Sequence, residues 1–244
     1  MLLLPLLLAA SPTLDANSAG MKLYRAQKYP EAAEQFRAAI RAGEREAPGP
    51  TVRDAVQLTR QRALAQFNLG CTLALLRKAG RVCEFDAYRS AVVEAVQQAI
   101  TLDPGRLEKA LVDPDLAGVR DTLAFQSWKG LSPSREGDLT KLLHSVRWWS
   151  VGAGVFGSIH ELTFSDQGFA LTMKVFDQDG NPLERRKTVY GKWALAGRTL
   201  TLFFPVEHAE LKKARSFEGT FTDEGQLVFK GWVEFSDAPS ECDA

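Results

Sequence analysis

Residues 20–40 read GMKLYRAQKYPEAAEQFRAAI, and this stretch decides the fold of the first half of the chain. Pro30 stands where a helix can begin, because the first helical position tolerates a missing backbone N–H. After it, apolar residues recur at the spacing of one helix face, namely Ala32, Phe36, Ala39 and Ile40. We therefore predict two short helices folded against each other, the first capped by Asn17 or Ser18. A lone helical hairpin leaves an apolar face open, so we expect a second copy.

The second copy begins within ALAQFNLGCTLALL, residues 63–76, and ends with SAVVEAVQQAITLDP, residues 90–104. Gly20 and Ala32 are small residues where the two antiparallel helices of the first pair can cross closely, and Leu69–Gly70 of the second copy corresponds to the place of Gly20. A helical pattern that starts at Thr51 predicts an elongated first helix in this copy. Residues 77–88 predict a long loop between its two helices.

These residues resemble the tetratricopeptide repeat, whose signature is a small residue in the first helix and A-x-x-x-F-x-x-A in the second. Gly20 and Gly70 stand farther apart than the family period of about 34 residues. The DPDL segment that begins at Asp113, with Phe125 after it, resembles the closing segment of a bacterial class of such repeats. The resemblance covers about residues 17–128. It implies a concave surface for an extended peptide or a partner helix, with the candidate residues Lys22, Arg25, Gln66 and Asn68.

The second half of the chain has the two-residue alternation of β-strands. Residues 129–138, KGLSPSREGD, have the composition of a linker, and about seven strands follow within residues 139–244. Turn sequences separate them at 165–168, 177–182, 195–198 and 222–225. The pattern predicts an antiparallel meander and resembles the small lipocalin-like barrels of bacterial exported proteins, with an open β-sandwich as the competing architecture. The expected fold class is α+β in two domains.

The first residues, MLLLPLLLAASPTLDA, indicate export. An apolar run of about ten residues that ends in small residues fits a signal peptide and is too short to span a bilayer. We expect a signal peptide over residues 1–16, a periplasmic or extracellular protein and no integral membrane segment. An apolar N-terminus on a cytosolic protein is the alternative. A disulfide between Cys71 and Cys83 is left open, and Cys242 is either free or the partner of one of them.

No catalytic constellation stands out in the sequence. His144, His160 and His208 come from different expected elements, and the glycine-rich residues 152–158 lack the Lys and Ser/Thr of a phosphate loop. We therefore expect no catalytic residues, no cofactor and no metal. Trp149 and Trp232 are the candidate ligand-binding residues, since aromatic side chains of a barrel can grip an apolar ligand.

The predicted function is that of an exported, non-enzymatic adaptor. In this interpretation the helical module binds a protein partner, and the β domain binds a ligand or a second partner. The alternative is a carrier that holds a small apolar ligand in the barrel, with the helices as a docking arm. A formal net charge of zero argues against nucleic acid as a partner, because phosphate binding needs a concentrated positive field.

Overall fold

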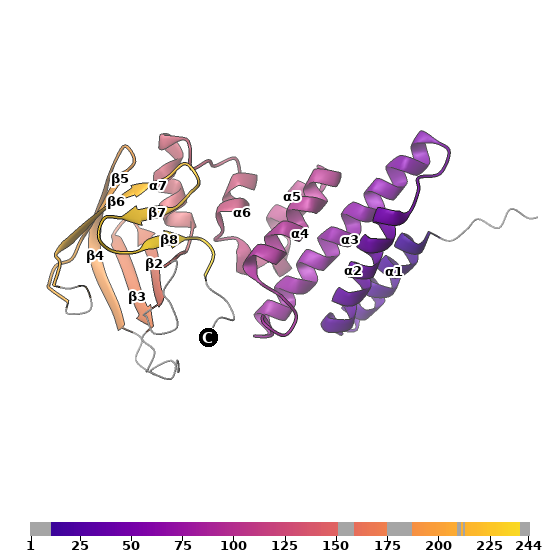
Figure 1. Ribbon diagram of the computed structural model, residues 1–244, viewed down its shortest axis with the longest axis horizontal. Helices are drawn as coiled ribbons and strands as arrows, with labels where there is room; N and C mark the ends of the chain where they lie inside the picture. Colours follow the sequence, from indigo (N-terminus) through magenta and orange to yellow (C-terminus); the bar gives the residue numbers. More distant parts are fainter. Residues whose placement is uncertain (1–10, 151–158, 175–186, 209–210, 212, 240–244) are drawn as a thin grey trace, which may run out of the picture. The chain divides into compact units, whose positions relative to one another are not determined.

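The computed structural model describes residues 11–150, 159–174, 187–208, 211 and 213–239. The chain divides into two compact units, residues 1–118 and 119–244. The first unit is helical, and the second contains a closed antiparallel barrel (Figure 1). This architecture confirms the predicted α+β class, with helices first and an antiparallel β domain second.

The helical unit is built from two antiparallel helix pairs and a short closing segment. α1 packs against α2, α2 against α3 and α3 against α4. In chain order the elements are α1 (Pro12–Arg25), α2 (Tyr29–Arg45), α3 (Val52–Lys78), α4 (Arg89–Leu102), α5 (Arg106–Val112) and the 3-10 helix η1 (Pro114–Val119). Both predicted hairpins are therefore present. Among the described residues, no helix combines the length and the apolar character that crossing a membrane requires.

The start of α1 differs from the prediction. Ser11 is the N-cap, and its hydroxyl accepts a hydrogen bond from the backbone N–H of Leu14 at 3.3 Å. The predicted cap at Asn17 or Ser18 is wrong, since both residues lie inside the helix and Asn17 is buried. Residues 12–16, the end of the predicted signal peptide, form the first turns of α1, and residues 1–10 lie outside the described part of the chain.

The elongated first helix of the second pair is confirmed. α3 begins after Thr51 in a reciprocal capping box: the Thr51 hydroxyl accepts from the Asp54 N–H, and the Asp54 carboxylate accepts from the Thr51 N–H, both at 3.1 Å. Only the later part of α3, from Ala63 onward, is almost continuously buried. Its first turns are mostly exposed, because α4 is much shorter than α3.

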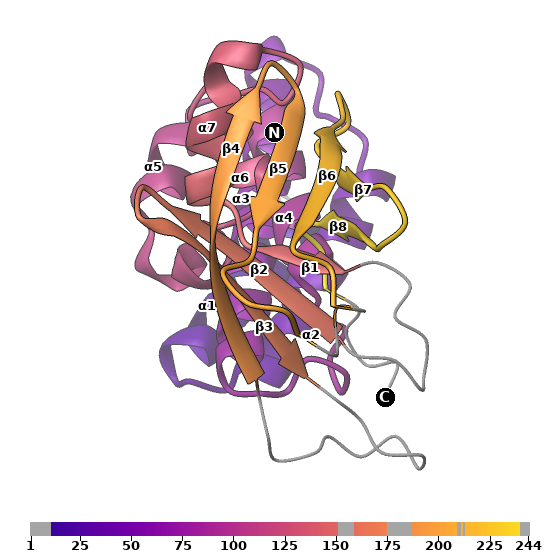
Figure 2. The same cartoon turned by 90° about the vertical axis from the view of Figure 1, so that its left-hand side faces the viewer.

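The barrel is a meander of eight strands in the described residues, each antiparallel to its neighbour, and it closes through β1 and β8 (Figures 1 and 2). The strands are β1 (Trp148–Ser150), β2 (Ile159–Ser165), β3 (Gly168–Lys174), β4 (Lys187–Ala196), β5 (Thr199–Phe203), β6 (Ser216–Phe221), β7 (Leu227–Phe229) and β8 (Glu234–Ser236). Closure excludes the open sandwich. The predicted turns at 165–168, 195–198 and 222–225 each join two paired strands. The turn at 177–182 and the glycine-rich residues 152–158 lie outside the described residues.

The structure has eight strands in the described residues where the sequence pattern predicts about seven, because the end of the meander is a hairpin. Residues 226–235 have the alternation of one strand, whereas β7 and β8 pair with each other on either side of a tight turn. Gly231 sits in this turn with φ 72°, a left-handed conformation that glycine adopts without steric cost. The alternation of apolar residues continues through the turn and hides it at the level of sequence.

Two further helices belong to the barrel unit, α6 (Leu123–Trp128) and α7 (Glu136–Ser145). Leu139, Leu142 and Leu143 of α7 are fully buried in the barrel core. The Leu123 N–H donates to the Asp237 carboxylate at 2.7 Å and ties the start of α6 to the end of the chain's described part. The predicted linker, residues 129–138, thus overlaps a helix, and the two units divide before it, at Gly118.

Candidate functional site

The four residues predicted to bind a partner have unequal access to solvent. Lys22 and Arg25, near the end of α1, are exposed, and Gln66 of α3 is half-buried. Asn68 is buried, and its side-chain amide donates a hydrogen bond to the Asn17 side chain at 3.0 Å. The Asn68 side chain is thus held by a hydrogen bond between α3 and α1. Of the four predicted residues, Lys22 and Arg25 are the ones exposed to a partner.

A groove that sequence reasoning missed lies between α3 and the end of α4. It encloses about 340 Å³, and its lining comes from Val52, Ala55, Val56, Thr59, Arg60, Leu102, Asp103 and Pro104. Because α4 ends beside Thr59 and Arg60, the first turns of α3 continue without it. Val52 is 83% exposed and Val56 is 45% exposed, so the apolar lining reaches solvent. The feature of the sequence that indicates this groove is the difference in length between the two helices of the second pair, α3 and α4.

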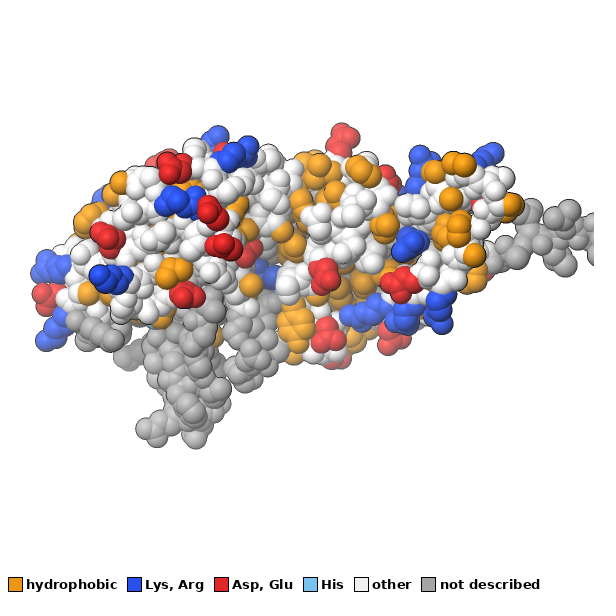
Figure 3. Space-filling model, turned by 45° about the horizontal axis from the view of Figure 1, so that its top comes forward, with side chains coloured by type: hydrophobic (Ala, Val, Ile, Leu, Met, Phe, Trp, Pro, Cys, Tyr) orange, Lys and Arg blue, Asp and Glu red, His pale blue; other side chains and the backbone are white. Residues whose placement is uncertain are grey.

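Charged groups stand at the rim of this groove. Arg60 is exposed on α3, and Asp103, just after α4, forms an ion pair with Arg106 at 3.2 Å. Figure 3 shows hydrophobic side chains at the surface of the helical unit, on the right of the view, with basic and acidic side chains between them. The groove thus has an apolar floor and a charged rim.

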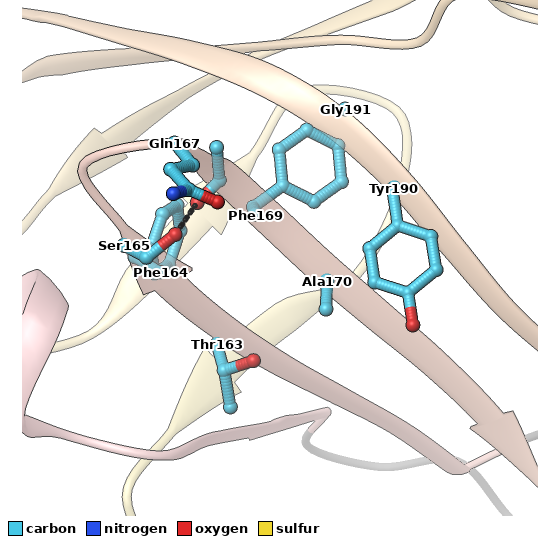
Figure 4. A pocket seen from close by; sticks show the side chains of 9 residues that line it. Thr163, Phe164, Ser165, Gln167, Phe169, Ala170, Tyr190 and Gly191 are labelled. Carbon is cyan, nitrogen blue, oxygen red and sulfur yellow. Dashed lines mark hydrogen bonds between the residues drawn. The ribbon is translucent and has the colours of Figure 1, made fainter.

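A second hollow, of about 310 Å³, lies over β2, β3 and β4 on the outside of the barrel. Thr163, Ala170 and Tyr190 stand side by side across the three strands in register. Figure 4 shows the Tyr190 ring beside Ala170, whose small side chain leaves the space open. Tyr190 is 67% exposed, so its ring is available to a ligand.

The two predicted ligand-binding tryptophans are both half-buried in the barrel unit. Trp232 lies in the turn between β7 and β8 and stacks on Phe217 with ring centroids 4.5 Å apart. It also packs 5.6 Å from the ring of His160, whose pKa is lowered by burial. Trp149 is a residue of β1, opposite Glu161 of β2. Trp232 is therefore part of an aromatic cluster that packs on itself.

The interior of the barrel is lined by aromatic and aliphatic side chains that contact one another. Phe164, Phe169 and Phe204 are buried and form a chain of ring contacts, with centroids 6.5 Å and 5.1 Å apart. An eight-stranded barrel is just wide enough for such side chains to fill it. The inward residues thus account for the stability of the barrel.

The cysteines differ in state. Cys71 is a free thiol buried in α3, whereas Cys83, in the loop after α3, is bonded in a disulfide. A bond between Cys71 and Cys83 is therefore excluded. Cys242 lies outside the described residues. Within the described residues, the one group of three His, Cys, Asp or Glu side chains spaced as metal ligands consists of Cys71, Asp113 and Asp115.

The chain was compared with known protein families, with curated proteins and with solved structures, and none of them matches it.

Proposed function

We propose that the chain is a non-enzymatic binding protein whose helical unit docks a partner protein in the groove between α3 and α4. The observation that carries the proposal is the exposure of Val52 and Val56 beside the end of α4. Contiguous apolar surface with a charged rim is typical of a docking site. The resemblance of the helical unit to tetratricopeptide repeats supports the same function, because such repeats present surfaces for protein partners.

An amphipathic helix is the partner element that suits this groove. Val52 and Val56 lie one helical turn apart on α3, so they match apolar residues spaced three or four positions apart on a facing helix. Arg60 and Asp103 stand at the rim, and because Asp103 is already paired with Arg106, Arg60 is the charge that an acidic residue of the partner would meet. A groove of about 340 Å³ is small, so we expect modest affinity.

The proposal is tested with the double variant Val52→Asp/Val56→Asp. Both side chains are exposed, so the variant should keep its helical content and thermal midpoint. The matched control is Val112→Asp, which changes a valine of α5 that is 71% exposed and outside the groove. Partners are captured by cross-linking from the native envelope fraction and then titrated, purified, against each variant by calorimetry.

A partner that binds the wild type and the Val112→Asp control, and binds the groove variant at least tenfold more weakly, supports the proposal. Equal binding by the groove variant contradicts it. A third variant, Lys22→Ala/Arg25→Ala, tests the surface predicted from the repeat family. Loss of binding in that variant alone would move the docking site to α1.

We also propose that the protein acts outside the cytoplasm. The support is its apolar N-terminal run, which has the length and the small-residue ending of a signal peptide. N-terminal sequencing of the protein from its native host tests this proposal. A mature chain that retains Met1 and the apolar run contradicts it.

The second candidate function is a carrier of a small apolar ligand, with the β domain as the binding part. It is favoured by the aromatic cluster around Trp232 and by the exposed Tyr190 ring over the outer hollow. Native mass spectrometry of the purified protein distinguishes the two functions. A mass above that of the chain, removed by unfolding and absent from Trp232→Ala or Tyr190→Ala, would favour the carrier.

A further inference from the structure

The outer face of the barrel carries a broad aromatic ring among small hydroxyl side chains. Tyr190 of β4 is 67% exposed, and in the strand register it stands beside Ala170 of β3, which stands beside Thr163 of β2. Because side chains two positions apart on a strand share a face, Thr188 also lies on this outer side. Its hydroxyl is 3.1 Å from that of Thr172, its register partner on β3. The exposed ring thus has threonine hydroxyl groups among its neighbours on the sheet.

The hollow beside this ring exists because small residues line its floor. Ala170 fills little space, and Gly168 at the start of β3 has no room for a side chain. A Cβ atom on Gly168 would stand 2.2 Å from the Gly191 carbonyl oxygen, so a larger residue there would displace backbone. The hollow is therefore a feature of the sheet itself and does not depend on the rotamer of a long side chain.

The lining of the hollow is neutral. None of the described residues that form it carries a charge at neutral pH. The charged side chains nearest to it in sequence contact other groups. The Lys192 ammonium donates to the Gln167 backbone carbonyl at 2.6 Å, and the Asp166 carboxylate lies 3.7 Å from Nδ1 of His144. The lining thus offers polar groups and an aromatic ring but no charge to pair with a phosphate, a carboxylate or an ammonium group.

We propose that this hollow binds one neutral sugar residue of a glycan. A pyranose ring has an apolar face of C–H groups, which packs on an aromatic ring, and hydroxyl groups around its edge, which exchange hydrogen bonds with polar side chains. Tyr190 offers the aromatic ring. Thr163 and Ser165 offer hydroxyl groups, and Gln167 offers an amide that both donates and accepts. A purely apolar ligand would leave these polar groups without partners.

Figure 4 shows how these groups are placed. Ser165 and Gln167 lie together beside the turn between β2 and β3, and the Tyr190 ring lies beyond Ala170. The Ser165 hydroxyl donates to the Gly168 carbonyl oxygen at 3.1 Å, so its own oxygen can accept from a sugar hydroxyl. The hollow encloses about 310 Å³, near the low end of the range of about 300–1,000 Å³ for small-molecule pockets, so it suits one ring.

The hollow is separate from the docking groove, which lies in the helical unit and shares no residue with it. A sugar also differs from the ligand of an apolar carrier, because most of its edge is hydroxyl groups. One aromatic ring in a shallow hollow gives weak binding, so we expect dissociation constants in the millimolar range.

Saturation-transfer-difference NMR on the full chain is the test, because it detects weak binding. The probes are the neutral oligosaccharides cellotetraose, chitotetraose, maltotetraose and xylotetraose. We expect at least one of them to receive saturation, with the strongest transfer to the C–H protons of one sugar ring. Tyr190→Ala should weaken that binding at least tenfold or abolish it. Tyr190→Phe, which keeps the ring, should bind as the wild type does.

Ala170→Leu places a larger side chain in the hollow and should also remove binding, although Tyr190 is still present. The control is Phe203→Ala, which removes a ring of β5 that is 46% exposed and does not line the hollow, and it should bind as the wild type does. Thermal midpoints show whether each variant is folded. If Ala170→Leu fails to fold, the comparison of Tyr190→Ala with Tyr190→Phe carries the test.

N-phenyl-1-naphthylamine is the neutral apolar probe for the competing ligand class. Binding of this dye that depends on Tyr190, without transfer to any oligosaccharide, overturns the proposal in favour of the apolar carrier. Absence of transfer to every oligosaccharide at millimolar concentration also overturns it, as does binding that survives both Tyr190→Ala and Ala170→Leu. Val52→Asp/Val56→Asp should leave oligosaccharide binding unchanged, so the outcome here is distinct from the outcome for the docking groove.

Discussion

Gly20 of α1 lies directly against the ring of Phe36 of α2: a Cβ atom on Gly20 would stand 2.6 Å from Cε1 of that ring. The second helix pair repeats this relationship. A Cβ atom on Gly70 would stand 2.6 Å from Cγ2 of Val96. The two pairs thus share a close crossing at a glycine of the first helix, which is the structural counterpart of the small-residue position in the sequence pattern.

Gly20→Ala and Gly70→Ala should each destabilise the helical unit. Overpacking costs about 1–3 kcal/mol, and the better helix propensity of alanine offsets up to about 1 kcal/mol of it. Gly137→Ala in α7 is the control, since a Cβ atom there meets no heavy atom within 4 Å apart from its chain neighbours and the adjacent backbone of its own helix, and it should be neutral or slightly stabilising. Urea unfolding followed by circular dichroism measures all three. Equal midpoints for Gly20→Ala and Gly137→Ala would contradict the close crossing.

The hydrogen bond between Asn17 and Asn68 predicts that Asn68, a candidate partner-binding residue by its sequence pattern, contributes to the stability of the helical unit. Asn68→Ala leaves the Asn17 side-chain oxygen buried without its donor, which should lower the free energy of unfolding by about 1–3 kcal/mol. Gln66→Ala, two residues earlier on α3 and half-buried, should change it by no more than about 0.5 kcal/mol. The prediction fails if the two variants unfold at the same urea concentration.

His160 predicts a pH dependence of barrel stability. Burial lowers its pKa in the folded protein, so the unfolded chain takes up a proton first as the pH falls below about 6.5. The free energy of unfolding should therefore decrease between about pH 7 and pH 5, before the carboxylates titrate. His160→Phe, which retains an aromatic ring beside Trp232, should flatten this dependence. Unfolding curves with equal pH slopes in the two proteins would count against the role of His160.

Thiol reactivity should separate the cysteines into two classes. Cys71 is buried and its pKa is raised, so we expect no reaction with an alkylating agent until the chain unfolds. Cys83 is disulfide-bonded and should react only after reduction, whether or not the chain is folded. Peptide mapping by mass spectrometry reads both sites and identifies the peptide that is joined to Cys83. Alkylation of Cys71 in the native protein would contradict its burial.

The candidate sites were less predictable than the elements that carry them. Lys22 and Arg25 were selected from a family pattern and are exposed, but the same pattern selected Asn68, which α1 covers. A repeat pattern identifies the helix face on which a residue stands, and the neighbouring helix decides whether that face is open. The groove at Val52 depends on where α4 ends relative to α3, which periodicity within either helix does not state.

The sequence by itself determined the local elements of this protein. Apolar residues at helical spacing specified α2 and α4, Thr51 marked the start of α3, and Gly-containing turns separated most strands of the meander. These features follow from interactions between residues close in the chain. Only the tertiary structure decided the closure of β1 on β8, the position of α7 in the barrel unit and the meeting of Cys71 with Asp113 and Asp115. Each depends on contacts between residues far apart in the sequence, and their geometry is fixed by packing of whole elements rather than by any local pattern.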